Sequence, residues 1–305
     1  MSFSAQVKRE LCKNAPDKPC CALAELYGAL LFGQQFTFSC IRVVSENQAV
    51  VHRLSVLMKA AFGFGFDMKI TPEARGGKTV LTIGNRGKIE TMMEAFGQSR
   101  ENSLAVHLNF AVIEEDCCKA SLLRGAFLSG GSITDPEKDY HLELVTPHLS
   151  LGNELSALMT EVGLPPRMTM RKSNRVVYLK VSELIEDFLI MTGAPAASIK
   201  LMGAKVEKDF RNNINRKVNC ETANLTKTVE ASGEQSEAIE KLARSGVLGT
   251  LPGPLRETAR LRLQHPEATL NELSALHSPA IGRSGLNHRL RKLVAISRMN
   301  GEEKA

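Results

Sequence analysis

The stretch at residues 282 to 297 carries side chains that could bind DNA. Its candidate DNA-binding residues are all polar or basic: Arg283, Ser284, Asn287, His288, Arg289, Arg291 and Lys292. Arg, Asn and Ser near the start of a helix can hydrogen-bond base edges in the major groove. Cations further along, at Arg289, Arg291 and Lys292, could reach phosphates. The chemistry predicted for this stretch is therefore recognition of duplex DNA.

The surrounding pattern is typical of a helix-turn-helix. Leucines recur at helical spacing and predict a buried face opposite the polar residues, at Leu286, Leu290 and Leu293. Upstream, Thr269 and Glu272 form the TLNE pattern of a capping box, which predicts where a preceding helix begins. The segment SPAIG would form the turn. A basic amphipathic helix alone is common, but its position after a capped helix and a Pro-containing turn favours a helix-turn-helix.

A small all-α domain is predicted over residues 223–305. It contains four short helical stretches separated by Gly and Pro, namely GEQSEAIEKLARSG, PLRETARLRLQHP, TLNELSALH and GRSGLNHRLRKLVAIS. Residues 200–222 form a polar, basic connector. A helical stripe of Leu201, Val206, Phe210 and Ile214 indicates that this connector is a helix bridging two domains.

Charge is divided unevenly along the chain. Residues 1–199 hold 21 Lys and Arg against 21 Asp and Glu, whereas residues 200–305 hold 18 against 12, so the net charge of +6 lies in the last third. Affinity for nucleic acid that does not depend on sequence comes from neutralising phosphates, which makes the C-terminal region the expected phosphate-binding part. The alternative is that this modest excess serves only solubility.

Residues 1–199 contain an internal repeat at an offset of 97. The stretch LYGALLFGQQF is matched by LLRGAFLSGGS, and the aligned pairs are Cys20-Cys21 with Cys117-Cys118, Gly28 with Gly125, and Gly33 with Gly130. The halves span about 20–97 and 117–194. Small residues at helical spacing would let two helix backbones approach closely, so we expect the helices holding Gly28 and Gly125 to be in contact.

Both halves have the same order of predicted elements. The first reads as a helix, the strand FTFSCIRVV, a helix, the hairpin FDMKITPE with KTVLTIG, and a helix. The second repeats this with the strand YHLELVTP and the hairpin RMTMRKSNRVVYLKV. A period near a hundred residues indicates duplication of a small α+β unit.

No cofactor or metal is expected from the motifs. The seven cysteines include no CxxC pair, and we favour reduced, mostly buried thiols over a metal or redox role. The histidines show no HExxH spacing, and no P-loop, GxSxG or GxGxxG motif is present. No stretch approaches the roughly 20 apolar residues of a membrane span, and the start lacks a signal-peptide pattern, so we expect a cytoplasmic protein without a membrane partner.

The paired motifs LYGALLFGQ and LRGAFLSGG resemble the LAGLIDADG motif of homing endonucleases, whose two motif helices form the interface between pseudo-symmetric halves. In that family the eighth motif position is an acid that holds a divalent metal. Here those positions are Gly33 and Gly130. Glycine offers no side-chain oxygen to a hard cation, so the resemblance implies a retained scaffold without nuclease chemistry.

The segments NCETANLTKTV, LRETARLRLQHP and SGLNHRLRKL, following the LAGLIDADG-like duplication, resemble the WhiA family of bacterial DNA-binding regulators. The resemblance implies an α+β fold, with a duplicated LAGLIDADG homing-endonuclease-like N-domain followed by a small all-α helix-turn-helix domain. It implies a non-enzymatic, nucleoid-associated regulator acting in transcription, cell division, chromosome segregation or sporulation. The expected partner is double-stranded DNA, with other transcription regulators as a second class.

Two rival interpretations remain open. A working endonuclease would need Glu25, Asp135, Glu137 or Asp139 in place of the lost acids, but none has an acidic mate at the 97-residue offset. A sensor or protein-binding role for the N-domain is neither supported nor excluded. The hairpins also carry cations that could contact nucleic acid, although we favour solvated turn residues: Lys69, Arg75, Lys78, Arg167, Arg171, Lys172 and Arg175.

Overall fold

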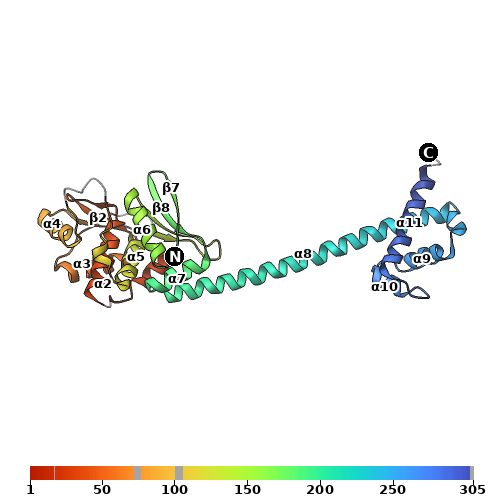
Figure 1. Cartoon of the computed structure of the whole chain (residues 1–305), viewed down its shortest axis with the longest axis horizontal. Helices are drawn as coiled ribbons and strands as arrows, with labels where there is room; N and C mark the ends of the chain where they lie inside the picture. Colours follow the sequence, from red (N-terminus) through yellow and green to blue (C-terminus); the bar gives the residue numbers. More distant parts are fainter. Residues whose placement is uncertain (17, 72–76, 100–105, 303–305) are drawn as a thin grey trace. The chain divides into compact units, whose positions relative to one another are not determined.

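The computed structural model describes residues 1–16, 18–71, 77–99 and 106–302, and the chain divides into two compact units (Figure 1). The first unit is Met1–Asp209 and the second is Phe210–Ala305. The division falls inside the stretch predicted as a basic connector. Among the described residues, no helix is both long and apolar enough to cross a membrane.

The first unit consists of two halves, and the elements between residues 19 and 95 of the first have equivalents between residues 116 and 192 of the second. The first half contains α1 (Phe3–Leu11), α2 (Pro19–Leu31), β1 (Gln35–Phe36), β2 (Ile41–Ser45), α3 (Gln48–Phe62), β3 (Asp67–Thr71), β4 (Lys78–Ile83) and α4 (Arg86–Ala95). The second contains η1 (Phe110–Ile113), α5 (Asp116–Gly130), β5 (Gly131–Ile133), β6 (Leu142–Thr146), α6 (Leu149–Glu161), β7 (Arg167–Arg171), β8 (Asn174–Leu179) and α7 (Ser182–Thr192). The predicted duplication of an α+β unit is confirmed.

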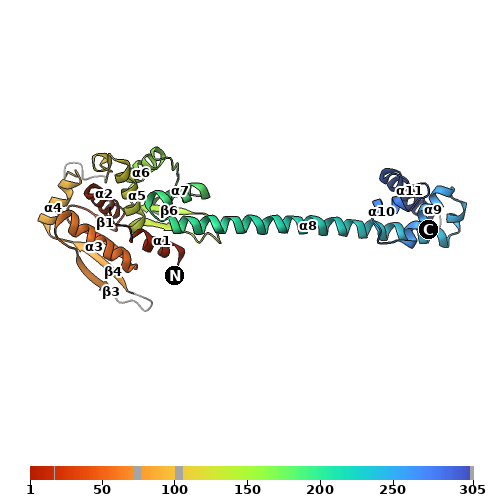
Figure 2. The same ribbon diagram turned by 90° about the horizontal axis from the view of Figure 1, so that it is seen from below.

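Each half builds one antiparallel sheet of the same topology. The strand orders are β1-β2-β4-β3 and β5-β6-β8-β7. The central pairs run from Ile41 opposite Ile83 in one sheet and from Leu142 opposite Leu179 in the other. Both predicted hairpins form, as β3–β4 and β7–β8. Helices cover one face of each sheet, with α3 on the first (Figure 2) and α6 on the second, which explains why buried residues alternate along β6.

The helices α2 and α5 pack closely against each other at the centre of this unit. A Cβ atom added to Gly28 would lie 2.2 Å from the Leu122 carbonyl oxygen, and one added to Gly125 would lie 1.9 Å from that of Glu25. Each contact is the other one displaced by 97 residues, so the two halves are related by a pseudo-two-fold axis between these helices. The predicted contact of the two glycine-bearing helices is confirmed. Only glycine permits so close an approach of the two backbones.

The stretch predicted as one strand over FTFSCIRVV forms two short strands instead. The Thr37 N–H donates to the Cys40 carbonyl at 3.0 Å, and the Thr37 hydroxyl accepts from the Cys40 N–H at 3.1 Å. These local hydrogen bonds close a turn between β1 and β2. A hydroxyl that bonds its own neighbouring backbone competes with the sheet ladder, and this competition is not visible in β-propensity.

Helix α8 (Pro195–Arg244) is a single helix of 50 residues that contains the predicted connector. The stretch at residues 233–246, predicted as a separate short helix, belongs almost entirely to it. Leu201 of the predicted stripe is buried, but Val206 and Phe210 are each 68% exposed. The stripe therefore indicates the helix correctly and does not mark a packed face along its whole length.

The second unit has a small helical core. After α8 come η2 (Val247–Thr250), α9 (Gly253–Gln264), α10 (Leu270–Ala275) and α11 (Arg283–Glu302). The core is formed by Ile239 and Leu242 of α8 together with buried side chains from all three later helices: Leu255, Ala259, Leu261, Leu273, Leu286, Leu290 and Leu293. This core fixes the positions of α10 and α11 relative to each other, because each helix buries an apolar face in it.

Candidate nucleic-acid interface

The start of α10 is fixed by a complete capping box. The Glu272 N–H donates to the Thr269 hydroxyl at 3.3 Å, while the Glu272 carboxylate accepts from the Thr269 N–H at 2.8 Å. The backbone N–H and the hydroxyl of Thr269 both donate to this carboxylate and hold the pKa of Glu272 below its ordinary value. The predicted capping box is confirmed.

The face of α11 that packs on the core is the predicted one. Leu286, Leu290 and Leu293 are fully buried. They fix the rotation of the helix about its axis, since turning the helix by about 100°, the angle between successive residues, would expose at least one of these leucines. The polar residues between them are therefore held away from the core.

None of the seven predicted DNA-binding residues is buried, although Arg289 lies at the edge of the buried leucine face. Five are exposed, and Asn287 and Arg289 are half-buried. None of the seven side chains makes a hydrogen bond or an ion pair with another of the residues that the structure describes. By contrast, Arg298 on the same helix pairs with Glu234 at 2.5 Å. The predicted residues therefore present to solvent hydrogen-bond donors and positive charges that have no partner among the described residues.

A polar groove opens at the N-terminus of α11. It has a volume of about 500 Å³ and is lined by residues of α8, α9, α10 and α11, including Asn224, Lys227, Asn271, Arg283 and Asn287. Three of these were absent from the predicted set. Asn224 and Lys227 belong to α8, far from α11 in sequence, so spacing along one helix could not have grouped them. The polar side chains of Asn224, Thr226 and Lys227 were the available signal.

Arg262 of α9 supports the loop that leads into α10. It is 2% exposed, and its Nη1 donates to the Ala268 carbonyl oxygen at 2.8 Å. Burial lowers the pKa of this guanidinium, which has no carboxylate partner among the described residues. Its hydrogen bond holds Ala268 next to the cap residue Thr269, so a side chain not singled out from the sequence positions the start of α10.

In the first unit, the positions that match the metal-binding acids are closed to side chains. A Cβ atom on Gly33 would lie 2.9 Å from the Arg42 carbonyl oxygen, and one on Gly130 would lie 2.8 Å from that of Val145. Backbone atoms cannot swing aside as a flexible side chain can. The space for a carboxylate is missing at these two positions as well as the carboxylate itself.

Glu25, one of the acids weighed as a replacement, is engaged inside the protein. It is fully buried and accepts from Arg53 Nε at 2.8 Å, from Arg53 Nη2 at 2.7 Å and from Arg124 Nη1 at 3.2 Å. Asp135 accepts the N–H of Glu137 at 3.1 Å in a local turn. Glu25 therefore balances two arginines at the helix interface and is not free to bind a metal.

The hairpin cations are partly neutralised by neighbouring acids. Arg171 pairs with Glu143 at 2.8 Å and Lys78 with Glu46 at 3.4 Å, while Arg175 donates to the Asn153 side chain at 3.1 Å. Lys172 occupies the left-handed conformation in the β7–β8 turn. Arg75 lies outside the described residues. The exposure of Arg171 and Lys172 agrees with the interpretation of the hairpin cations as solvated surface residues, whereas Arg175 is half-buried.

Fold and site together define a helix-turn-helix protein that also carries a duplicated LAGLIDADG-like domain. A family model for the WhiA C-terminal HTH domain matches residues 214–297, and one for the WhiA LAGLIDADG-like domain matches residues 119–211. A protein of Desulforamulus reducens named "Probable cell division protein WhiA" is 40% identical, with 97% of this chain and 95% of that protein covered. A protein of the same name from Clostridium botulinum is 38% identical, with 97% of this chain and 98% of that protein covered. The chain belongs to the WhiA family.

Known structures share this fold. The crystal structure of full-length DUF199/WhiA from Thermatoga maritima matches with a TM-score of 0.60 at 23% identity, covering 98% of this chain and 99% of that one. A second structure, of the N-terminal LAGLIDADG domain of DUF199/WhiA, matches with a TM-score of 0.50 at 20% identity over 63% of this chain and 90% of that one. The predicted fold class, a LAGLIDADG-like N-domain followed by a helix-turn-helix domain, is confirmed.

Proposed function

We propose that this protein is a sequence-specific DNA-binding regulator that reads duplex DNA through α11 and acts on the chromosome without cleaving it. The observation that carries the proposal is the set of seven polar side chains of α11, none of which is buried or has a partner among the described residues. Free donors and uncompensated cations on a rigid helix match base edges and phosphates.

We assign base recognition to the N-terminal end of α11 and phosphate contacts to its middle. Arg283 and Asn287 line the groove at the start of the helix, where a recognition helix enters the major groove. Arginine can donate two hydrogen bonds to guanine, and asparagine can pair with adenine in the same bidentate manner. Lys227 and Asn271 line the same groove, and we add them as contacts to the DNA backbone.

The proposal includes the absence of metal-dependent nuclease activity. Gly33 and Gly130 supply no ligand, the backbone closes around both positions, and Glu25 is held by two arginines. An acid placed at either glycine would have to displace backbone before it could bind Mg²⁺. A role in cell division is supported by the names of the two relatives, and roles in transcription, chromosome segregation or sporulation rest on the family resemblance.

Selection from a random library of duplex DNA tests this function. The full chain should enrich one sequence motif over successive rounds, because base contacts give specificity beyond phosphate attraction. An Asn287→Ala variant should fail to enrich that motif while still binding DNA at low salt. Incubation of the full chain with the enriched duplex and Mg²⁺ should leave both strands intact. Enrichment of no motif, or nicking at a fixed position, would overturn the proposal.

A further inference from the structure

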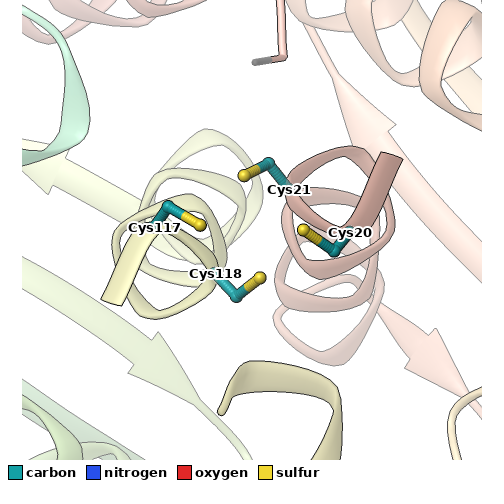
Figure 3. Close-up of side chains that lie close together, drawn as sticks. All are labelled: Cys20, Cys21, Cys117 and Cys118. Carbon is teal, nitrogen blue, oxygen red and sulfur yellow. The ribbon is translucent and has the colours of Figure 1, made fainter. Parts of the chain in front are cut away.

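Four cysteine thiols meet at one end of the helix pair α2 and α5. The Sγ atoms of Cys20, Cys21, Cys117 and Cys118 all lie within 4.8 Å of one another. Figure 3 shows the two pairs pointing toward each other across the interface between the helices. Cys21 and Cys118 are buried, Cys117 is half-buried and Cys20 is exposed. In the sequence these cysteines mark the repeat, but their spacing alone does not predict that the two pairs meet.

The duplication explains why the thiols converge. Cys20 and Cys117 are equivalent at the offset of 97, as are Cys21 and Cys118, and the pseudo-two-fold axis passes between α2 and α5. The glycine contacts at Gly28 and Gly125 let these helices approach closely. Any residue in the first turn on the facing side therefore meets its own counterpart, so two vicinal pairs become one group of four ligands.

Burial raises the pKa of the Cys21 and Cys118 thiols, so a bound metal cation would have to favour their thiolate forms. Both pairs lie in the first turn of their helix, and neither N-cap residue, Lys18 or Glu115, uses its side chain to cap the helix. The positive end of the helix dipole favours negative charge at that place. A thiolate, and not a thiol, is the form of cysteine that binds metals.

We propose that Cys20, Cys21, Cys117 and Cys118 form a structural zinc site. Tetrahedral zinc with Zn–S bonds of about 2.3 Å requires sulfur atoms about 3.8 Å apart, so small side-chain rotations would adjust the present cluster to it. Mg²⁺ and Ca²⁺ prefer oxygen ligands and do not fit a group of four sulfurs. Four protein ligands leave no open coordination position, which makes the site structural and not catalytic.

The site would clamp the two halves of the first unit at the N-terminal ends of the motif helices. Gly33 and Gly130, which match the metal-binding positions of the nucleases, lie at the opposite, C-terminal ends. A metal bound only by the folded chain stabilises it, since the unfolded chain does not hold the four thiolates together. This proposal concerns the first unit and is independent of DNA reading by α11.

Metal analysis of the full chain tests the site. Protein purified in the presence of a thiol reductant should contain about one zinc per chain, and replacement by Co²⁺ should give the strong visible absorption of tetrahedral thiolate coordination. Cys20→Ser changes the exposed ligand and should not prevent folding, yet it should lower zinc affinity at least about tenfold and weaken the thiolate absorption. Cys220→Ser, at an exposed cysteine of α8, is the matched control and should keep full zinc content.

Several results would overturn the proposal. One is a folded protein with less than about a tenth of an equivalent of zinc after zinc is offered and excess removed. Another is equal zinc content in the wild type and in a variant with all four cysteines replaced by serine, which would show binding elsewhere. Two disulfides among these cysteines, found by thiol titration and mass mapping together with no bound metal, would make the cluster a covalent crosslink instead.

Discussion

Among single residues, Gly28 and Gly125 at the interface of α2 and α5 set how closely the two halves of the first unit approach. We expect Gly125→Ala to destabilise the protein by about 1 to 3 kcal/mol, because the new Cβ would lie 1.9 Å from the Glu25 carbonyl oxygen and the helices would have to separate. Chemical denaturation of the full chain, followed by circular dichroism, measures the change in free energy of unfolding.

Gly203→Ala in α8 is the matched control for that substitution. No heavy atom lies within 4 Å of its added Cβ, and alanine is favoured over glycine in a helix by about 1 kcal/mol. It should therefore leave stability unchanged or raise it. Equal effects of the two substitutions would contradict the close helix packing.

Glu25 provides a second prediction at this scale. Glu25→Gln should cost about 3 to 5 kcal/mol of stability, because Arg53 and Arg124 would keep buried charge without a counter-charge. Glu161→Gln removes an acid that pairs with Lys119 on the surface and should cost less than about 1 kcal/mol. A Glu25→Gln protein as stable as the Glu161→Gln protein would show that the buried ion group contributes little.

At the scale of elements, the capping box sets the start of α10. Thr269→Ala should weaken the helix start by about 1 kcal/mol at neutral pH and increase hydrogen exchange in residues 270–275. The folded-state pKa of Glu272 is lowered, so its contribution is complete above its unfolded pKa of about 4.3 and is lost as the pH falls through the lower folded value. The difference between wild type and variant should therefore shrink in acid; a constant difference would exclude Glu272 from the cap.

Much of the element order was predictable from sequence, and the exceptions have physical reasons. The hairpins, the motif helices and the Thr269 cap carried short-range signals of alternation, spacing and hydrogen-bonding residues. The length of α8 did not. A helix boundary was predicted at Gly233, but glycine costs a helix only about 1 kcal/mol, and no proline follows Pro195 until Pro252. Without a proline to stop it, the helix continues.

The candidate site was predictable only where it lies on one helix. The polar face of α11 follows from the spacing of its leucines, and none of the seven residues is buried in the structure. Residues that converge from other elements were missed, including Lys227, Arg262 and the cysteine cluster. Lys227 and Asn271 line one groove although they are 44 positions apart in sequence, and the cysteines meet through the pseudo-two-fold axis. Local sequence patterns encode neither kind of proximity.

At the scale of the whole molecule, binding to DNA should depend strongly on salt. Each phosphate neutralised contributes about 0.9 to the slope of the logarithm of affinity against the logarithm of salt concentration. Arg291→Ala and Lys292→Ala should each lower that slope by about 1 and weaken all sequences alike, since phosphate contacts carry no base information. Fluorescence anisotropy over a series of salt concentrations measures this, and an unchanged slope would remove these residues from the phosphate-binding set.

Reading of the DNA sequence by α11 is tested by comparing affinity for the selected motif with affinity for random duplex. Asn287→Ala and Arg283→Ala should each lose about 1 to 3 kcal/mol on the motif and much less on random DNA. Arg171→Ala in β7 should leave both affinities near the wild-type values. If the two α11 variants kept specific binding while Arg171→Ala abolished it, the reading surface would belong to the first unit and the account would be wrong.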